Sequence, residues 1–254
     1  MMYSNMKNLI FVILFFIVQT GLSQAISYRY ITPKKGNGQE FRKALGDKTK
    51  KYNSKEGDQK IYTFGVRASQ GGAMMSVVRM TYGETLGELQ GGGNPSGMWD
   101  YWMKNVDIHI ESQSSNEIFM LRKRATHNDA IGTDKPFRRV FHYNVKHGHQ
   151  DKFWKIRDNL PAAIEKSGVD LDINSFMSFA GGSRQHARIV IFGESMESFE
   201  SGSGDWQKIR EAYEELNGYG SWELDWELSN SSLLDYGNNM ELLEFLPELS
   251  SPLN

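Results

Sequence analysis

The feature that most constrains the fold of this sequence is an internal repeat. When the chain is shifted by 112 residues against itself, two long stretches align without a gap. Phe41 then falls on Phe153, and Phe64 falls on Phe176. Identity between the copies is low, so the signal lies in the ordered run of matches and not in any single pair. Two similar halves therefore make up most of the 254-residue chain.

Each copy carries the same order of predicted elements. Strands rich in Tyr, Val and Phe open the copies at residues 27–32 and 139–145, because aromatic and β-branched residues favour strands. A helix, two strands joined by a glycine-containing turn, and a second helix follow. Strand-like segments close each half, and in the second half these are Glu223–Leu228 and Met240–Leu246. The order β-α-β-β-α-β is that of a ferredoxin-like unit.

Two such units in one chain have a natural way to bury their sheets. A ferredoxin-like sheet covers one face with its helices and leaves the other bare, so two copies can pack face to face. In this order of elements the chain, from about Ser27 to Leu249, resembles the dimeric α/β-barrel superfamily in a tandem, fused form. The predicted fold class is α+β, with two ferredoxin-like repeats packed sheet to sheet as a pseudo-dimeric α/β barrel. The resemblance implies relatives that include cofactor-free monooxygenases, haem-handling enzymes and stress or binding proteins.

The first residues of the chain predict export. An unbroken apolar run from Leu9 to Val18 follows a single positive charge, Lys7. Such a run spans about 15 Å as a helix, half of a bilayer core, so a signal-peptide core fits better than a membrane span. Gly21 and Ser23 are small residues suited to cleavage before Gln24. We therefore expect a secreted or periplasmic protein without a membrane anchor after cleavage.

The remaining boundaries follow from the repeat and from composition. We assign residues 1–23 to the signal peptide, 24–124 to the first repeat, 125–136 to a linker and 137–254 to the second repeat. The linker is polar, lacks periodicity and contains Gly132 and Pro136, which favour turns.

Charge and cysteine content exclude several classes of function. The chain has no cysteine, which removes disulfides, thiolate metal sites and cysteine nucleophiles. A net charge of −2 gives no support for a nucleic-acid partner. The charge is nevertheless uneven, since the segment from Glu194 to the end holds 14 acidic residues and only Lys208 and Arg210 as basic ones. A solvated acidic surface explains this, and a docking surface for a partner is the alternative.

Strand alternation selects the residues of a candidate site. In the second copy Phe141 and Tyr143 form the more apolar face, which suits packing on helices, so the alternate face points into the barrel. The same parity and the 112-residue shift extend the set to the first copy and to the third strands. The residues predicted to line the interior are Tyr28, Tyr30, Thr32, His142, Asn144, His186 and Arg188. Polar groups among apolar ones are typical of a ligand cavity; the alternative is a packed core in which they hydrogen-bond one another.

Within this set, two residues are the candidates for catalysis. His142 is the predicted general base, since a pKa of about 6.5 suits proton transfer near neutral pH. Tyr30 is placed to orient a substrate oxygen, and the other five are predicted to bind the ligand. The resemblance implies a monooxygenase-like reaction on a phenolic or enolic substrate.

We expect a small, partly apolar ligand, no metal and no cofactor. Three questions stay open at this point. Whether the chain is an enzyme is undecided, as is its oligomeric state. Binding of haem, with a histidine as its axial ligand, is one alternative to the small-ligand function. A non-catalytic interaction or structural protein with an acidic C-terminal docking surface is another.

Overall fold

A computed structural model describes residues 24–69, 75–89, 95–128, 135–200 and 203–253. The predicted signal peptide, residues 1–23, lies outside the described residues, as do residues 129–134, half of the predicted linker. Within the described ranges, no helix combines the length and the apolar character that crossing a membrane requires.

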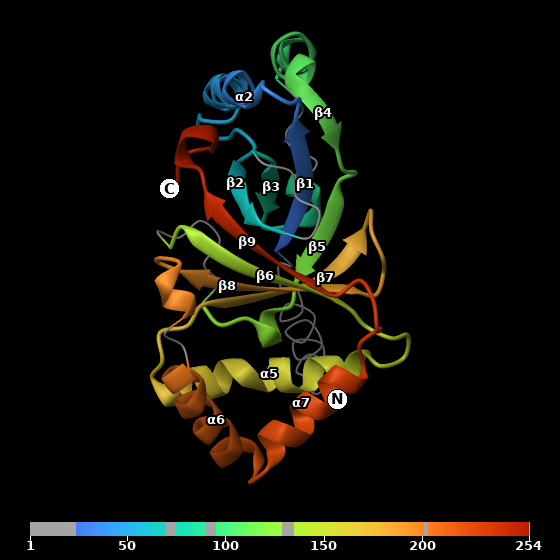
Figure 1. Cartoon of the computed structure of the whole chain (residues 1–254), viewed down its shortest axis with the longest axis vertical. Coiled ribbons are helices and arrows are strands. Elements are labelled where there is room, and N and C mark those ends of the chain that lie inside the picture. Colours follow the sequence, from blue (N-terminus) through green and yellow to red (C-terminus); the bar gives the residue numbers. More distant parts are fainter. Residues whose placement is uncertain (1–23, 70–74, 90–94, 129–134, 201–202, 254) are drawn as a thin grey trace, which may run out of the picture.

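Eight antiparallel strands form a closed barrel (Figure 1). The hydrogen-bonded order is β3-β2-β9-β6-β8-β7-β5-β1, and pairing between β1 and β3 closes the ring. A short ninth strand, β4, extends the pairing of β1 at one end. The strands are β1 (Ala25–Pro33), β2 (Ile61–Ala68), β3 (Val77–Gly83), β4 (Ile110–Gln113), β5 (Glu117–Leu121), β6 (Phe137–Asn144), β7 (Ile173–Ala180), β8 (His186–Gly193) and β9 (Asn239–Phe245).

The last strand of each half joins the two halves. β5 pairs with β1 of its own half and with β7 of the second half. β9 in turn pairs with β6 and with β2 of the first half. Because each half supplies a strand that bridges to the other, the two parts of the sheet close into one barrel instead of remaining two separate sheets.

Helices cover the outer face of the barrel at the two ends of the molecule's long axis in Figure 1. α2 lies at one end, and α5, α6 and α7 lie together at the other. The helices are α2 (Gly38–Tyr52), α3 (Leu86–Leu89), α4 (Met98–Tyr101), α5 (Gln150–Ser167), α6 (Ser203–Asn217) and α7 (Ser221–Ser231). Single turns of 3-10 or π-helix are η1 (Trp102–Val106), η2 (Asp107–His109), η3 (Lys123–Ala125), η4 (Glu197–Phe199) and η5 (Pro247–Leu249).

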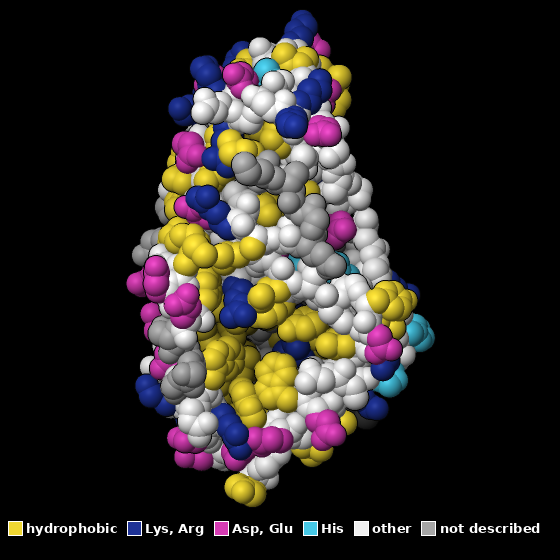
Figure 2. Space-filling model, in the orientation of Figure 1, with side chains coloured by type: hydrophobic (Ala, Val, Ile, Leu, Met, Phe, Trp, Pro, Cys, Tyr) yellow, Lys and Arg dark blue, Asp and Glu magenta, His cyan; other side chains and the backbone are white. Residues whose placement is uncertain are grey.

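Three apolar clusters hold these layers together. One fills the barrel and includes Phe64, Phe119 and Val140. A second lies between the barrel and α5, α6 and α7, where Figure 2 shows hydrophobic side chains gathered in a hollow. The third lies under α2, around Phe41 and Leu45. Burial of such side chains at about 25 cal/mol per Å² is the main favourable term in folding.

The barrel confirms the coarse prediction of an α+β fold of the dimeric α/β-barrel kind. The elements also recur at the predicted distance: α2 begins at Gly38 and α5 at Gln150, while β2 begins at Ile61 and β7 at Ile173. That the halves are two ferredoxin-like repeats with the predicted domain boundaries stays a prediction.

One predicted strand is wrong. Residues 223–228 lie within the helix α7 and not in a strand. Trp222 and Trp226 are four residues apart, so they share a helix face as readily as a strand face. Both rings pack against the cluster beneath α5 and α6, and this packing selects the helix.

Candidate functional site

A cavity of about 480 Å³ opens into the barrel, and it brings together most of the predicted site residues. Its volume is within the usual range of small-molecule sites. Six of the seven predicted residues line it, namely Tyr28, Tyr30, Thr32, His142, His186 and Arg188. The structure adds residues that the sequence did not single out, of which Glu117 and Glu241 carry charge.

Strand alternation explains why these side chains meet. Tyr28, Tyr30 and Thr32 follow one another at every second position of β1, so they share one face of the sheet. His142 of β6 is paired in register with Arg188 of β8, which puts both side chains on the same face. The intervening β6 residues, Phe141 and Tyr143, pack on the helix side, as predicted.

Asn144 is the predicted residue that does not line this cavity. It lies at the end of β6, where its side-chain amide donates to the carbonyl of Gly237 at 2.7 Å. Its backbone N–H also donates to the side chain of Asn238 at 2.8 Å. Asn144 therefore fixes the loop that leads into β9, and the ligand-binding role predicted for it has no support in this arrangement.

Glu241 of β9 is the centre of the polar network in the cavity. Its carboxylate accepts hydrogen bonds from the Tyr30 hydroxyl at 2.7 Å and from the Tyr28 hydroxyl at 3.1 Å. His142 Nε2 lies 3.0 Å from the same carboxylate. Arg188 Nη2 lies 3.5 Å away, and only 2% of Arg188 is exposed. One buried acidic group thus contacts four of the predicted site residues.

The surroundings of Glu241 favour its ionised form. Burial by itself would raise the pKa of Glu241, but the hydrogen bond with His142 and the positive charge of Arg188 outweigh burial and lower it. Burial also raises the pKa of Tyr30 and of Tyr28 well above the ordinary tyrosine value, with the charge of Glu241 adding to the effect. At neutral pH the cavity therefore holds an anionic carboxylate facing two neutral phenols.

A second carboxylate is linked to Glu241 through two imidazoles. His142 Nδ1 lies 3.0 Å from His186 Nε2. His186 Nδ1 lies 3.6 Å from the carboxylate of Glu117, which is slightly longer than a hydrogen bond. Burial lowers the pKa of His142, and the interaction with His186 lowers the pKa of Glu117. Glu117 is about one third exposed. The series of contacts from Glu117 through the two histidines to Glu241 therefore runs from the mouth of the cavity to its buried wall.

No clear signal in the sequence pointed to Glu241 as a site residue. It is one of two glutamates in β9, with Glu244, and an odd separation puts the two on opposite faces of the strand. One of them must point inward, and the alternation of neighbouring leucines does not say which. Arg188 offered the available clue. It was predicted to point into the barrel, and a buried arginine needs an acidic partner, which favours an inward-pointing glutamate such as Glu241.

Comparison with known proteins agrees with the fold. No protein-family model matches the chain, and no curated protein matches it in sequence. Solved structures do match. A protein from Lactobacillus acidophilus, provisionally named a monooxygenase, is 11% identical with a TM-score of 0.54, covering 91% of this chain and 97% of its own. An anthrone oxidase-like protein is 9% identical with a TM-score of 0.53, covering 89% and 92%.

A variant of chlorite dismutase from Candidatus Nitrospira defluvii also shares the fold. It is 8% identical with a TM-score of 0.51, and the match covers 89% of this chain and 93% of that one. These neighbours are dimeric α/β-barrel proteins, which confirms the predicted resemblance. At such identities the likeness establishes the fold alone.

The prediction that the protein uses no cofactor is wrong, because the fold on which it rested also occurs in haem proteins. The chlorite dismutase-like neighbours, which share this barrel, are haem proteins. The fold therefore does not select the cofactor-free members.

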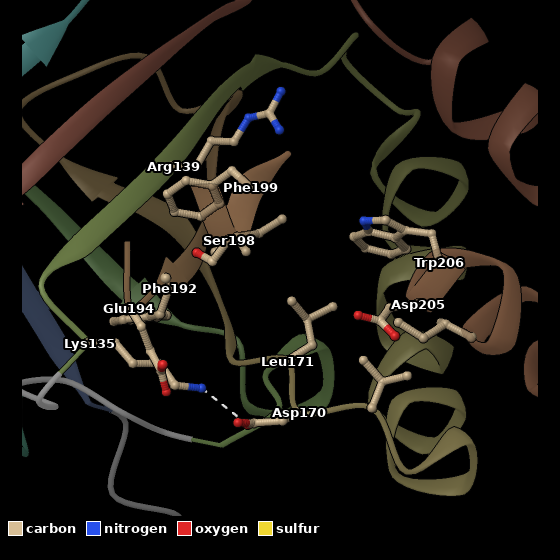
Figure 3. Close-up of a pocket in the computed structure, with 14 residues that line it drawn as sticks. Lys135, Arg139, Asp170, Leu171, Phe192, Glu194, Ser198, Phe199, Asp205 and Trp206 are labelled. Atoms are coloured by element: carbon tan, nitrogen blue, oxygen red, sulfur yellow. Dashed lines mark hydrogen bonds and ion pairs between the residues drawn. The ribbon is translucent and has the colours of Figure 1, made fainter. Parts of the chain in front are cut away.

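The histidines of this cavity nevertheless do not fit haem. An axial histidine presents a free ring nitrogen to the iron, whereas His142 uses both nitrogens and His186 uses Nε2 and turns Nδ1 toward Glu117. A separate cavity of about 260 Å³ lies between the barrel and α6, and none of the described residues that line it is a histidine (Figure 3). Its walls include Arg139, Phe199 and Trp206.

Proposed function

We propose that the chain binds a small, partly apolar molecule with an acidic hydroxyl inside the barrel and removes the proton of that hydroxyl. The observation that carries the proposal is the contact of Tyr30 with Glu241 at the wall of the cavity. An ionised carboxylate held behind a neutral phenol is a base that acts through a hydroxyl. The names of the neighbours, a monooxygenase and an anthrone oxidase-like protein, support a phenolic or enolic ligand.

The proton has a defined route in this arrangement. The ligand hydroxyl donates to Tyr30 Oη while Tyr30 passes its own proton to Glu241, so the ligand becomes an oxyanion that Tyr30 stabilises. Tyr30 begins and ends the step neutral, as its raised pKa requires. Arg188, buried beside Glu241, keeps a positive charge next to the reacting groups throughout.

The two histidines offer a way to carry the proton onward. Once Glu241 is protonated, the relay starts from the Nδ1–H tautomers of both imidazoles: Glu241 gives its proton to His142 Nε2, His142 Nδ1 gives one to His186 Nε2, and His186 Nδ1 gives one to Glu117, which leaves both imidazoles neutral as Nε2–H tautomers. The last gap, 3.6 Å, is closed by a small side-chain movement or by one water molecule. His142 was predicted as the base itself; with both ring nitrogens engaged, it serves in this proposal as the relay behind Glu241.

Anthrone is a suitable probe, because its enol is an acidic hydroxyl on an apolar ring system and its enolate absorbs at longer wavelength. We expect the protein to bind anthrone saturably near pH 7 and to raise the fraction of enolate. Glu241→Gln removes the base and abolishes the enolate signal. Glu244→Gln, the same change on the outer face of β9, leaves it intact. No binding of anthrone or of simpler phenols, or an unchanged signal in Glu241→Gln, would refute the proposal.

We also propose that the protein acts after export. The support is the apolar run from Leu9 to Val18 with small residues before Gln24. Expression of the full chain with N-terminal sequencing of the secreted or periplasmic product tests this. A mature terminus at or next to Gln24 is the expected result, and an intact N-terminus in the cytoplasm is the contrary one.

A further inference from the structure

A second polar cavity lies on the outer face of β1 and β3, toward α2 and away from the barrel interior. It has a volume of about 260 Å³. Three of its lining residues are cations: Arg29 of β1, Lys48 of α2 and Arg79 of β3. Among the residues that the structure describes, none of those lining this cavity is acidic.

The three cations lie close together, and two of them are almost completely buried. Arg29 and Arg79 are direct partners in the β1–β3 register, so their side chains share one face. Lys48 is 4% exposed and Arg79 is 5% exposed. Like charges directly opposite one another on a sheet are destabilising, and burial adds to that cost.

The hydrogen bonds of this cluster leave it without a counter-charge. Lys48 Nζ donates to the side chain of Asn53 at 2.6 Å, and Arg79 Nη2 donates to the Thr49 hydroxyl at 3.3 Å. Both acceptors are neutral. Arg29 lies over the ring of Trp102, with 5.2 Å from its guanidinium carbon to the ring centroid. Across the described ranges, no ion pair involves any of the three cations.

One donor in the cluster is left over. Within the part of the chain that the structure describes, Arg79 Nη1 is buried and has no hydrogen-bond partner. A buried N–H of a charged group that lacks an acceptor is costly, and native proteins usually supply one. The unpartnered Nη1 belongs to a side chain that lines the cavity, so the missing acceptor has room beside it.

We propose that this cavity is a binding site for an oxyanion, the phosphate, sulfate or carboxylate group of a small molecule. Its oxygens would accept from Arg79 Nη1 and from Lys48, and its charge would offset the three cations. Trp99 and Trp102 lie in the same lining, which provides an apolar wall for an organic part of the ligand. The site is separate from the barrel cavity, with which it shares no lining residue.

The charges around Lys48 also favour a bound anion. Burial, together with the charges of Arg79 and Arg29, lowers the pKa of Lys48 to about 7. These two arginines are the charged groups that face Lys48 in the cavity. A bound oxyanion would restore the charged form of Lys48. Binding of sulfate, whose own charge is constant over this range, would therefore strengthen as pH falls from 8 to 6.

The test uses the mature protein with inorganic phosphate and sulfate, measured by isothermal titration calorimetry and by thermal unfolding. Sodium chloride at equal ionic strength controls for screening. We expect phosphate or sulfate to raise the Tm above its value in chloride. Lys48→Met and Arg79→Met should weaken binding by about tenfold or more. Lys43→Met, an exposed position on the same helix, should leave binding unchanged.

Two further measurements are needed: one compares organic with inorganic anions to identify the ligand, and one checks that the variants are folded. Tighter binding of phenyl phosphate or benzoate than of the inorganic ions assigns the site to an organic oxyanion, whereas equal binding assigns it to a free ion. In chloride alone, Lys48→Met should unfold at the same or a higher temperature than wild type, because it removes a buried repulsive charge. If none of the four anions binds or raises the wild-type Tm, the proposal is overturned. An equal loss of binding in Lys43→Met overturns it as well.

Discussion

The Tyr30 hydroxyl lies 2.7 Å from both carboxylate oxygens of Glu241. Tyr30 is on β1 and Glu241 is on β9, and these strands are not neighbours in the sheet. Their hydrogen bond therefore crosses the interior of the barrel, which is feasible because the sheet closes on itself through β1 and β3. The same closure brings the first and last strands of the described chain to one site, so the site is complete only in the closed barrel.

The first prediction concerns the charge of Glu241. In Glu241→Gln, Arg188 stays buried but loses its anionic partner, and an uncompensated buried charge typically costs about 3–5 kcal/mol. We expect a loss of roughly 3 kcal/mol in the free energy of unfolding, measured by urea denaturation at pH 7. Glu244→Gln breaks only the more exposed pair with Arg67, so its cost should stay below about 1 kcal/mol. Equal losses in the two variants would contradict the assignment of Glu241 as the internal counter-charge.

The second prediction concerns pH. The pKa of His142 is lowered by burial from its ordinary value of 6.5. Below pH 6.5 the unfolded chain therefore binds a proton that the folded chain resists, so stability falls as pH drops from 6.5 toward the folded pKa. Glu241 adds a second loss at lower pH: its lowered pKa gives stability above its ordinary value of 4.5, and this is lost as pH falls through the folded pKa.

A substitution at His142 separates its contribution to the pH dependence of stability from that of Glu241. Urea unfolding of His142→Gln should show a flatter dependence between pH 7.5 and 5.5 than the wild type. His147→Gln, in an exposed turn, should keep the wild-type slope. If His142→Gln lost stability over this range as steeply as wild type, the buried neutral state of His142 would be refuted.

The repeat and the strand parity predicted much of this arrangement because both depend on local periodicity. A period of two in β1 and β6 was enough to orient Tyr30 and His142. Glu241 was not predictable in the same way, because its partners are 53 to 213 residues away and only the closed barrel brings them together. The helix α7 was missed for a related reason: Trp222 and Trp226 fit two periods, and packing against α5 and α6 decides between them.

The third prediction tests that packing. Trp226 lies 5.3 Å from the guanidinium of Arg157, which also stacks on Phe153 at 3.7 Å. Trp226→Ala should cost about 3 kcal/mol in the free energy of unfolding, since it opens a cavity between α5 and α7. Leu224→Ala, more than half exposed on the same helix, should cost less than about 1 kcal/mol. Similar costs for the two would place the Trp226 ring in solvent and contradict the helix orientation.

The last prediction separates the proposed proton transfer from stability. Tyr30→Phe keeps the ring and removes the hydroxyl that links a ligand to Glu241, while Tyr28 still donates to the carboxylate. We expect a modest loss of about 1–2 kcal/mol in the free energy of unfolding. Formation of the anthrone enolate should fall by about 100-fold or more, the usual contribution of a proton-transfer group.

The matched control for this variant is Tyr62→Phe. Tyr62 packs in the same interior cluster, against Phe245, but it does not line the cavity. Stopped-flow absorbance of the enolate compares the two variants at equal folded fraction, which circular dichroism establishes first. Should Tyr30→Phe form the enolate as fast as Tyr62→Phe, the route through Tyr30 would be excluded, and Glu241 would have to receive the proton directly.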